Sequence, residues 1–424
     1  MPADCTHPDR PDSSDDTIWP SWHVSCQSVG VPRFEPFPAL RYGPQVALDD
    51  ASAPPYDVLS ASDVQQLRAR HDHNIVEVDV PGPDDDPTRY QRAADTLQHW
   101  QRDGTLVLDS APTFTLYRMR FVTEDGHERH TVGVIGALEV VDEGAGGVLP
   151  HERTTPKAKT DRLDLTRTTA TNLSPVWGLS LTAGLTDLLR APGVVVGRCI
   201  DEAGNEHTVE RVDDRDRIAA ISRAVAANPV LIADGHHRYA ISRTYRDQRR
   251  AADGPGPWDL TMAYVGELVD SQLSIDAIHR LYSGCSMEQL TEVLAPSFQL
   301  QPAGPVTAAM SRGVVERGAL CLVHPDGTGA WLTPRPEAFV GVRDLDGALL
   351  EHALRDVDID VSYQHGVGNV VDLVSSGAVA AGVLIRPTGI TEIRRTADEG
   401  LLMPPKSTFF TPKLRTGLVL RPMT

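Results

Sequence analysis

Lysine is scarce in this sequence. Only four of its 40 basic residues are lysine, and the other 36 are arginine. The four lie in two short stretches, TTPKAKTDR with Lys157 and Lys159, and PPKSTFFTPK with Lys406 and Lys413. An ammonium is a compact, mobile charge, whereas a guanidinium is a rigid planar fork. Unless the clustering is due to chance, it indicates that both stretches face one anionic site, so we expect them to meet in space.

Other features are also missing. The five cysteines contain no C-x-x-C pair, which fits reduced thiols and argues against a structural zinc site. No run of about 18 apolar residues occurs, and the N-terminus is acidic and polar, so we expect no membrane span, no signal peptide and a cytoplasmic location. The net charge of −18 disfavours nucleic acid and acidic membranes as partners. No P-loop, G-x-G-x-x-G or protein-kinase motif set is present, so any kinase here must use another fold.

The 424 residues are enough for two or three domains. We expect a disordered tail over 1–30, an N-terminal α/β region over 31–112, a core over 113–290 and a C-terminal α/β region over 291–424. TRYQRAADTLQHWQRDG has the apolar spacing of a helix, and TLVLD, FTLYRMRFV and HTVGVIGALEVV have that of strands. Because strands and helices do not alternate regularly, the sequence predicts the α+β class.

LIADGHHRYAIS, residues 231–242, places two histidines and an arginine directly after an Asp-Gly pair. The pattern predicts a buried strand, a tight turn at Gly235 and a helix. The first amides of a helix lack intrahelical acceptors, so this junction is a candidate anion site, to which His236, His237 and Arg238 would add donors. A solvated turn is the alternative. A metal ion bound by both histidines is disfavoured, because adjacent helical residues point about 100° apart.

Two further stretches could share this chemistry. PHERTTPKAKTDR, residues 150–162, is rich in charge, and its prolines favour a non-helical loop. MPPKSTFFTPK, residues 403–413, combines lysines, hydroxyls and prolines. Taken alone, each is typical of a solvated connector. Together with the junction they supply the cations, the N–H groups and, in Glu152, the carboxylate that phosphoryl transfer requires. We expect the basic residues that follow Glu152 to keep its pKa low.

Several motifs in a fixed order carry a family resemblance: PFPALRYGP, APPYDVLS, HNIV, LPHERT, KTDR, NLSPVWGL, IADGHHRY and MPPKSTFFTPK. Over about residues 34–424 the sequence resembles domain-of-unknown-function family 1015. That family is similar to the ParB/sulfiredoxin superfamily and to its archaeal free-serine kinase, which also has a Pro-His-Glu, an Asp-Gly-His-His-Arg and a C-terminal Pro-Lys-Thr/Ser-Thr loop. In this sequence 84 positions separate Glu152 from His236, which implies an insertion relative to that kinase.

The resemblance implies a ParB/sulfiredoxin-like nucleotide-binding core with added N- and C-terminal α/β regions, and it assigns roles to individual residues. Glu152 and His237 would be catalytic, and Asp234 would lie beside the metal-bound phosphates. ATP or ADP with Mg²⁺ would be the cofactors, and a small hydroxylated amino acid would be the other partner. Lys406, Ser407 and Thr408 would bind that substrate. The nucleotide phosphates would contact the following set: Asp234, Gly235, His236, His237, Arg238, Arg153, Lys157 and Arg162.

The sequence therefore predicts a small-molecule kinase that phosphorylates the hydroxyl of a free amino acid, with L-serine giving O-phosphoserine as the leading reaction. Two alternatives stay open. The first is a nucleotide-binding regulatory protein, related to partition proteins, without kinase activity. The second is a metal-dependent hydrolase built on His151, Glu152 and Asp234. The oligomeric state and the preferred nucleotide do not follow from the sequence.

Overall fold

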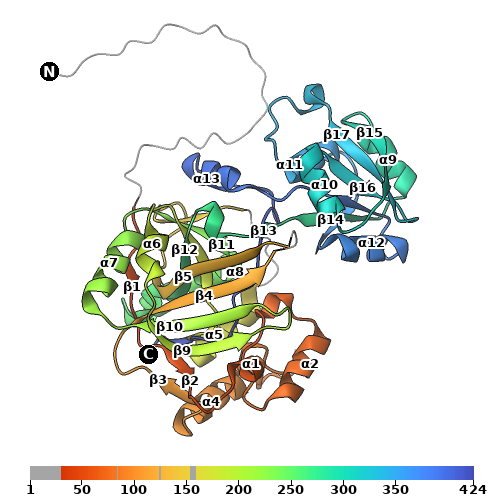
Figure 1. Ribbon diagram of the computed structural model, residues 1–424. Helices are drawn as coiled ribbons and strands as arrows, with labels where there is room; N and C mark the ends of the chain where they lie inside the picture. Colours follow the sequence, from red (N-terminus) through yellow and green to blue (C-terminus); the bar gives the residue numbers. More distant parts are fainter. Residues whose placement is uncertain (1–29, 84, 124–125, 153–158) are drawn as a thin grey trace, which may run out of the picture.

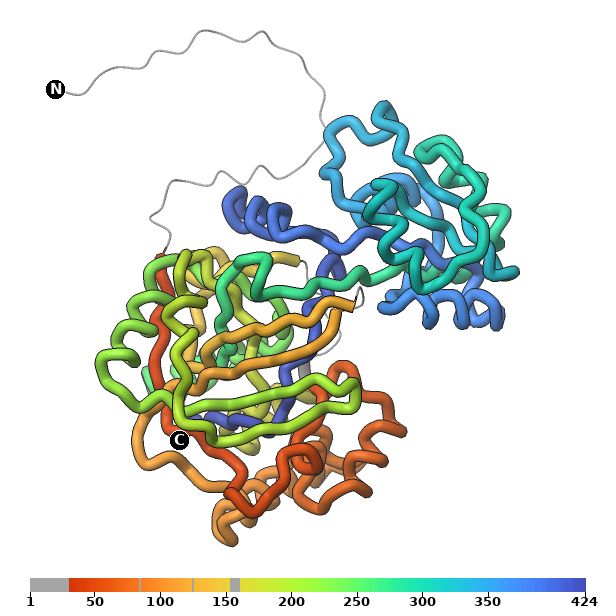
Figure 2. Tube along the Cα trace, viewed as in Figure 1, coloured from red at the N-terminus to blue at the C-terminus, as the bar shows by residue number. Residues whose placement is uncertain are grey.

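A computed structural model describes residues 30–83, 85–123, 126–152 and 159–424 of the protein. The expected disordered tail lies outside these residues except for Gly30, and so do Arg153 and Lys157. Figures 1 and 2 show two bodies, a larger one that contains both ends of the described chain and a smaller one formed by residues from the last third. In the described part of the chain, every helix is too short or too polar to cross a membrane.

The helices range from single turns to the long α8. Their bounds are α1 Leu48–Ala51, α2 Ala61–Arg70, α3 Val76–Asp79, α4 Arg89–Arg102, α5 Lys159–Thr169, α6 Leu185–Arg190, α7 Arg215–Val225, α8 His236–Asp253, α9 Met287–Leu294, α10 Met310–Arg317, α11 Asp346–Ala353, α12 Val367–Ser375 and α13 Ile390–Asp398. The helix predicted to end near Gly104 is α4.

The strands are β1 Phe34–Glu35, β2 Leu40–Tyr42, β3 Leu106–Leu108, β4 Phe114–Val122, β5 Glu128–Glu139, β6 Val148–Pro150, β7 Thr171–Asn172, β8 Val176–Ser180, β9 Val194–Ile200, β10 Glu206–Val212, β11 Val230–Asp234, β12 Leu260–Glu267, β13 Ile275–Asp276, β14 Ile278–Ser283, β15 Phe298–Pro305, β16 Leu320–Val323, β17 Thr328–Pro334, β18 Asp360–His365, β19 Ala381–Leu384, β20 Phe409–Phe410 and β21 Arg421–Pro422. The three strands predicted between residues 105 and 141 are β3, β4 and β5. The mixture confirms the α+β class.

The larger body is built, within the described residues, on a nine-stranded sheet of order β6-β11-β8-β12-β5-β4-β10-β9, with β1 paired to β5. The pairs β11–β6 and β12–β8 are parallel, and the others are antiparallel. In the β11–β6 register Ile232 lies opposite Pro150. Because these neighbours run in the same direction, Glu152 and Gly235 both follow strand ends at one edge of the sheet.

Both faces of this sheet are buried, and β11 contributes to both, as strand alternation requires. Val230 and Ile232 pack in a cluster with residues of α6, α7 and α8. Leu231 and Ala233 point to the other face, where the cluster includes Met403 and Phe410 of the C-terminal segment. Residues 403–419 thus cover one face of the sheet, and the loop that contains Lys406 lies close to the end of β11.

The smaller body contains an antiparallel six-stranded sheet of order β15-β17-β16-β19-β14-β18 within the described residues. The chain enters this body after β13 and leaves it after β19, and α13 then lies against the larger body (Figure 1). The division expected from the sequence remains a prediction. Strand pairing adds that β14, which precedes residue 291, belongs to the smaller sheet.

One local expectation is wrong. The charged stretch 150–162 was expected to form a loop throughout, but α5 begins at Lys159, so Asp161 and Arg162 are helical. No proline follows Pro156 in this stretch, and Asp161 in the first turn favours a helix start through the dipole. Leu163 of α5 packs in a cluster with Ile241 of α8, and this contact between helices is not visible in the local sequence.

Candidate active site

The strand, turn and helix around Gly235 have the predicted form. Gly235 is the N-cap of α8 and has φ +84°, a left-handed conformation that disfavours residues with a Cβ. A Cβ at this position would also lie 3.0 Å from Cζ of Arg238. Within the described residues no side chain caps the N-terminus of α8, and the first amides of a helix lack intrahelical acceptors. The junction therefore has the geometry of an anion site.

His151 ties three segments together. Its Nδ1 lies 2.5 Å from the Ile232 carbonyl oxygen, and its Nε2 lies 2.7 Å from Oγ1 of Thr408. A carbonyl oxygen only accepts, so Nδ1 carries the proton and Nε2 accepts from the Thr408 hydroxyl. Burial lowers the pKa of His151 to about 4, which keeps the ring neutral near neutral pH. The C-terminal loop is thereby fixed to the ends of β6 and β11.

Glu152 lies where these segments meet. Its Oε2 accepts from the Ser407 amide at 3.3 Å, its backbone forms a parallel bridge with Met403, and its side chain is 17% exposed. Burial raises the pKa of Glu152 to about 7, against the opposite effects of Lys406 and the Ser407 amide. The expectation of a low pKa is therefore wrong, because desolvation outweighs the cations that face the carboxylate.

Asp234 is held between two cations. Nη2 of Arg238 donates to its Oδ2 at 3.0 Å, and Nζ of Lys413 lies 3.5 Å from its Oδ1. Burial alone would raise the pKa of Asp234, but Lys413, Arg238 and His236 together hold it well below its usual value. A second Arg238 nitrogen, Nη1, donates to the Pro175 carbonyl. Arg238 is therefore engaged mainly within the protein, more than a purely phosphate-binding arginine would be.

Two buried nitrogen atoms at the junction lack hydrogen-bond partners within the described residues, Nε2 of His236 and Nε of Arg238. The His236 ring packs 4.8 Å from the His151 ring, and burial lowers the pKa of His236 well below its usual value. His237, the next residue of α8, is half-buried. An unpartnered buried polar group typically costs about 1–3 kcal/mol, so a bound ligand that satisfied these atoms would be stabilised.

Arg162 lies in a neighbouring small cavity of about 50 Å³ that Arg238, Tyr56 and Asp79 also line. Its Nη1 donates to Oδ1 of Asp79 at 3.2 Å, and its guanidinium stacks 4.0 Å from the centre of the Tyr56 ring. A phosphate role for Arg162 stays a prediction, and it would compete with these contacts.

The predicted substrate loop is held by a hydrogen bond within the loop and by side chains from other segments. Ser407 Oγ donates to the Pro404 carbonyl at 2.7 Å, and the Thr408 hydroxyl donates to Nε2 of His151. Lys406 is exposed, has φ +58° and forms no ion pair with another described residue. The expected meeting of Lys157 with Lys406 lies outside the described residues, but Glu152, five positions before Lys157, does contact Ser407, which adjoins Lys406.

The described residues contain no group of three or more His, Cys, Asp or Glu side chains that could hold a metal ion. Asp234 and Glu152 are the carboxylates of the site, and both already face cations. Mg²⁺ usually binds through one or two carboxylates and substrate phosphates, so a protein cage is not required. The described residues therefore form no preformed magnesium site.

A family model described as "Protein of unknown function (DUF1015)" matches residues 34–352. The chain belongs to the DUF1015 family. The matched range includes Glu152 and the turn at Gly235, and it ends before the loop that contains Lys406. No curated protein matches the chain.

Solved structures similar to this DUF1015 protein are distant from it. A conserved hypothetical protein from Pyrococcus furiosus shares 13% identity, covering 62% of this chain and 87% of its own, with a TM-score of 0.34. A free serine kinase in complex with AMP shares 12% identity, covering 62% and 83%, with a TM-score of 0.34. C-terminally truncated SbnI from Staphylococcus aureus shares 13% identity, covering 66% and 84%, with a TM-score of 0.36. At scores below 0.5, nothing about the activity of the chain follows from these similarities.

Two residues of this DUF1015 protein were given no individual role from its sequence. Lys413 lies in a stretch that the clustering of lysine placed at an anionic site, and it reaches Asp234. Arg280 of β14 is 4% exposed and donates to the carbonyls of Lys406 and Pro405 at 3.0 and 3.5 Å, so it holds the substrate loop from the smaller body. Nothing in its local sequence distinguishes it from the other arginines.

Proposed function

We propose that this DUF1015 protein transfers a phosphoryl group from ATP or ADP to the hydroxyl of a small free amino acid, with L-serine as the leading acceptor. The larger body would serve as a ParB/sulfiredoxin-like nucleotide-binding core, as the family resemblance implies. The observation that carries the proposal is the position of Glu152, whose carboxyl has a pKa of about 7 and lies at one sheet edge with the turn at Gly235.

Glu152 is suited to act as the general base. A group whose pKa lies close to the operating pH is ionised often enough to accept a proton and basic enough to hold it. In phosphoryl transfer the protein mainly orients the acceptor hydroxyl and stabilises the charge on the phosphoryl oxygens. The Ser407 amide donates to Oε2 at 3.3 Å, and Oε1, for which no hydrogen bond to another described residue is found, would accept from the substrate hydroxyl.

The phosphates would bind at the N-terminus of α8. Its first amides and Nε of Arg238, which has no partner among the described residues, are donors near one another, and Nε2 of His236 would join them in the tautomer that carries its proton there; a polyphosphate presents many acceptors. Lys413 and Arg238 neutralise Asp234, which would otherwise repel the phosphates. His237 follows in the same turn and is the predicted partner of Glu152 in catalysis.

The acceptor would bind at the C-terminal loop. The hydroxyls of Ser407 and Thr408 already make hydrogen bonds within the protein, so the ammonium of Lys406 is the group best placed to meet an amino-acid carboxylate. Any Mg²⁺ would arrive bound to the nucleotide phosphates and would neutralise part of their charge.

Product analysis tests this function. The protein is incubated with ATP or ADP, Mg²⁺ and a pool of hydroxylated amino acids, and the products are identified by mass spectrometry. We expect one amino acid, L-serine first, to gain a phosphate with loss of one phosphoryl group from the nucleotide. Nucleotide binding without any phosphorylated product would favour the regulatory protein, and release of inorganic phosphate alone would favour the hydrolase.

A further inference from the structure

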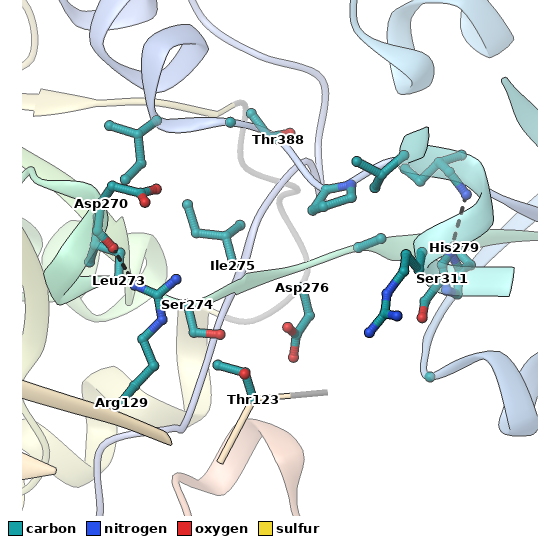
Figure 3. Close-up of a pocket in the computed structure, with 18 of the residues that line it drawn as sticks. Thr123, Arg129, Asp270, Leu273, Ser274, Ile275, Asp276, His279, Ser311 and Thr388 are labelled. Carbon is teal, nitrogen blue, oxygen red and sulfur yellow. Dashed lines mark hydrogen bonds between the residues drawn. The ribbon is translucent and has the colours of Figure 1, made fainter. Parts of the chain in front are cut away.

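Four consecutive carbonyl groups of the predicted substrate loop accept hydrogen bonds from side chains. They belong to Pro404, Pro405, Lys406 and Ser407. Two of the donor residues lie outside the loop: Arg280 on β14 of the smaller body, and Thr388 on the connection that follows β19. Figure 3 shows Thr388 on this connection and His279, the residue before Arg280, on β14. The backbone of the loop is therefore held from the smaller body and from the segment that leaves it.

Lys406 needs this support because its backbone has an unfavourable conformation. Its φ is +58°, in the left-handed region that residues with a Cβ seldom adopt. Such residues persist where the surrounding contacts hold them. Arg280 supplies two of these contacts, because its Nη1 donates to the Lys406 carbonyl at 3.0 Å and its Nη2 to the Pro405 carbonyl at 3.5 Å. The local path of the loop therefore depends on this guanidinium.

The peptide group between Lys406 and Ser407 connects Arg280 to Glu152. Its carbonyl accepts from Nη1 of Arg280, and its N–H, which belongs to Ser407, donates to Oε2 of Glu152 at 3.3 Å. The carbonyl and the N–H of one peptide group lie in a single plane, so a rotation that breaks one bond also weakens the other. A donor at the carbonyl also polarises the peptide group and makes its N–H a stronger donor. The guanidinium thus acts on the Glu152 carboxylate through the backbone.

Arg280 is a buried cation that forms no ion pair with another described residue. It is 4% exposed, its hydrogen bonds go to the carbonyls of Ile278, Pro405 and Lys406, and its guanidinium lies 4.9 Å from the centre of the Tyr363 ring. Burial lowers the pKa of Arg280, and Glu152 is among the groups that oppose this effect. A buried charge without a carboxylate partner is costly, so its position beside the loop indicates a role in the site.

We propose that Arg280 is a positioning residue for Glu152: it holds the Lys406–Ser407 peptide group so that the Ser407 amide keeps the carboxylate in place for the acceptor. The part played by the acceptor rests on the proposed function, whereas the connection between Arg280 and Glu152 is tested without turnover. The smaller body would then contribute to phosphoryl transfer through its strand β14.

The groups that face Glu152 determine the sign of the expected effect. Burial raises its pKa to about 7, and the nearby cations and the amide oppose this rise. The groups around the carboxylate are Lys406, the Ser407 amide, Asp234, Lys413 and the neutral His151, whose Nε2 lies 4.0 Å from Oε2. A hydrogen bond to the ionised carboxylate favours that form. When Arg280 no longer holds the peptide group, the ionised form loses support, so the pKa of Glu152 should rise further.

Arg280→Gln tests this connection by removing the charge and the planar fork. The pKa of Glu152 is measured by NMR on the full chain, labelled with ¹³C at the side-chain carboxyls of glutamate; the resonance that is missing from Glu152→Gln identifies Glu152. We expect Arg280→Gln to raise this pKa by at least about 0.5 pH unit above the wild-type value of about 7. Arg280→Lys keeps the charge but not the fork, so its value should lie between the two.

Thr388→Val is the matched control. The Thr388 hydroxyl donates to the Ser407 carbonyl at 2.7 Å, so valine also removes a support of the loop with little change in shape. That carbonyl belongs to the next peptide group, whose N–H is on Thr408 and does not contact Glu152. The pKa of Glu152 in Thr388→Val should therefore stay within about 0.2 pH unit of the wild-type value.

Turnover provides a second readout, which rests on the proposed function. At saturating substrate, Arg280→Gln should form product about 10- to 100-fold more slowly, because a misplaced catalytic group is costly. The KM for the nucleotide should stay within about threefold of the wild-type value. The rise of the rate on the acidic side should move to higher pH together with the pKa measured by NMR.

Gly347→Ala makes the same test with Arg280 retained, for the case that Arg280→Gln does not fold. A Cβ at Gly347 would lie 2.7 Å from Nη2 of Arg280 and would displace the guanidinium, whereas alanine favours the helix α11. The pKa of Glu152 should rise in this variant too. Thermal unfolding midpoints show which variants are folded.

An unchanged pKa of Glu152 in Arg280→Gln, or in Gly347→Ala if only that variant folds, would overturn the proposal. An equal rise in Thr388→Val would also overturn it, because any loosening of the loop would then have the same effect. A wild type that forms no phosphorylated product, while the pKa of Glu152 rises in Arg280→Gln, would contradict the proposed function and still support the connection between Arg280 and Glu152.

Discussion

A Glu152→Gln variant is expected to form phosphorylated product about 10²- to 10⁴-fold more slowly than the wild type, with nucleotide affinity nearly unchanged. Glutamine keeps the shape of the side chain and can still accept from the Ser407 amide. It cannot accept the proton of the acceptor hydroxyl. The nucleotide phosphates would bind at the N-terminus of α8 and not to Glu152. Nucleotide affinity, measured by calorimetry, should therefore not depend on the Glu152 carboxylate.

The pH dependence of stability of the same variant provides an independent test of the raised pKa of Glu152. The pKa of Glu152 is about 7 in the folded chain and 4.5 in the reference state. Between these values the folded state retains a proton that the unfolded state has lost, so Glu152 lowers stability as pH rises through this window. The difference of about 2.5 pH units corresponds to about 3 kcal/mol, so Glu152→Gln should be more stable than the wild type at about pH 8 and similar at about pH 4.

The matched control is Glu337→Gln, which changes an exposed glutamate of the smaller body. It should leave both turnover and the pH dependence of stability unchanged. Near wild-type turnover of the Glu152→Gln protein would show that Glu152 is structural and not catalytic. A Glu152→Gln protein that loses folding and nucleotide binding together would lead to the same conclusion.

Arg238→Ala is expected to lower the free energy of unfolding by about 3 kcal/mol, which is the low end for breaking a buried ion pair. The Arg238 and Asp234 side chains are 11% and 25% exposed, and the substitution removes both this contact and the hydrogen bond to the Pro175 carbonyl. Lys413 remains beside Asp234. The loss of unfolding free energy should therefore stay below the upper end of the range for a broken buried ion pair, about 5 kcal/mol. Nucleotide affinity should also fall, by about 10- to 100-fold, because a charge-assisted donor is lost.

Arg243→Ala is the control on the same helix. Its ion pair with Glu143 is exposed on the Glu143 side, where 82% of the side chain is accessible, and such pairs contribute about 0–1 kcal/mol. Chemical denaturation gives the unfolding free energies, and calorimetric titration of the folded variants gives the nucleotide affinities. If the two variants have equal unfolding free energies, the Arg238–Asp234 contact is not important for folding. If Arg238→Ala binds the nucleotide with wild-type affinity, Arg238 does not bind the phosphates.

Local signals were sufficient to predict the junction at Gly235. An apolar run, an Asp-Gly pair and a helical pattern occur within about twenty consecutive residues, and each depends on backbone preferences that the sequence shows directly. The helix α5 escaped prediction because its apolar side is stabilised by Ile241 of α8 and by Met423, which are distant in sequence. The smaller sheet likewise depends on pairing between β14 and the much later β18 and β19.

Which residues form the site stays a prediction, whereas the electrostatics expected at Glu152 were wrong. The family resemblance and the clustering of lysine predicted that Glu152, Asp234 and Lys406 belong to one site. The sign of the pKa shift at Glu152 was missed because burial is a property of the whole fold, and the cations nearby in sequence gave the opposite indication. The pairing of Lys413 with Asp234 and the support of the loop by Arg280 also depend on contacts that no local pattern specifies.

The pH dependence of product formation tests the central claim most directly, because it asks whether an ionised Glu152 is needed for phosphoryl transfer. The rate at limiting acceptor concentration is measured for the wild type from about pH 5.5 to 9, a range over which Glu152 changes its protonation state. The account predicts that the rate rises with an apparent pKa of about 7 on the acidic side. A rate that does not change across this range, or phosphoryl transfer that continues at the wild-type rate when Glu152 is glutamine, would contradict it.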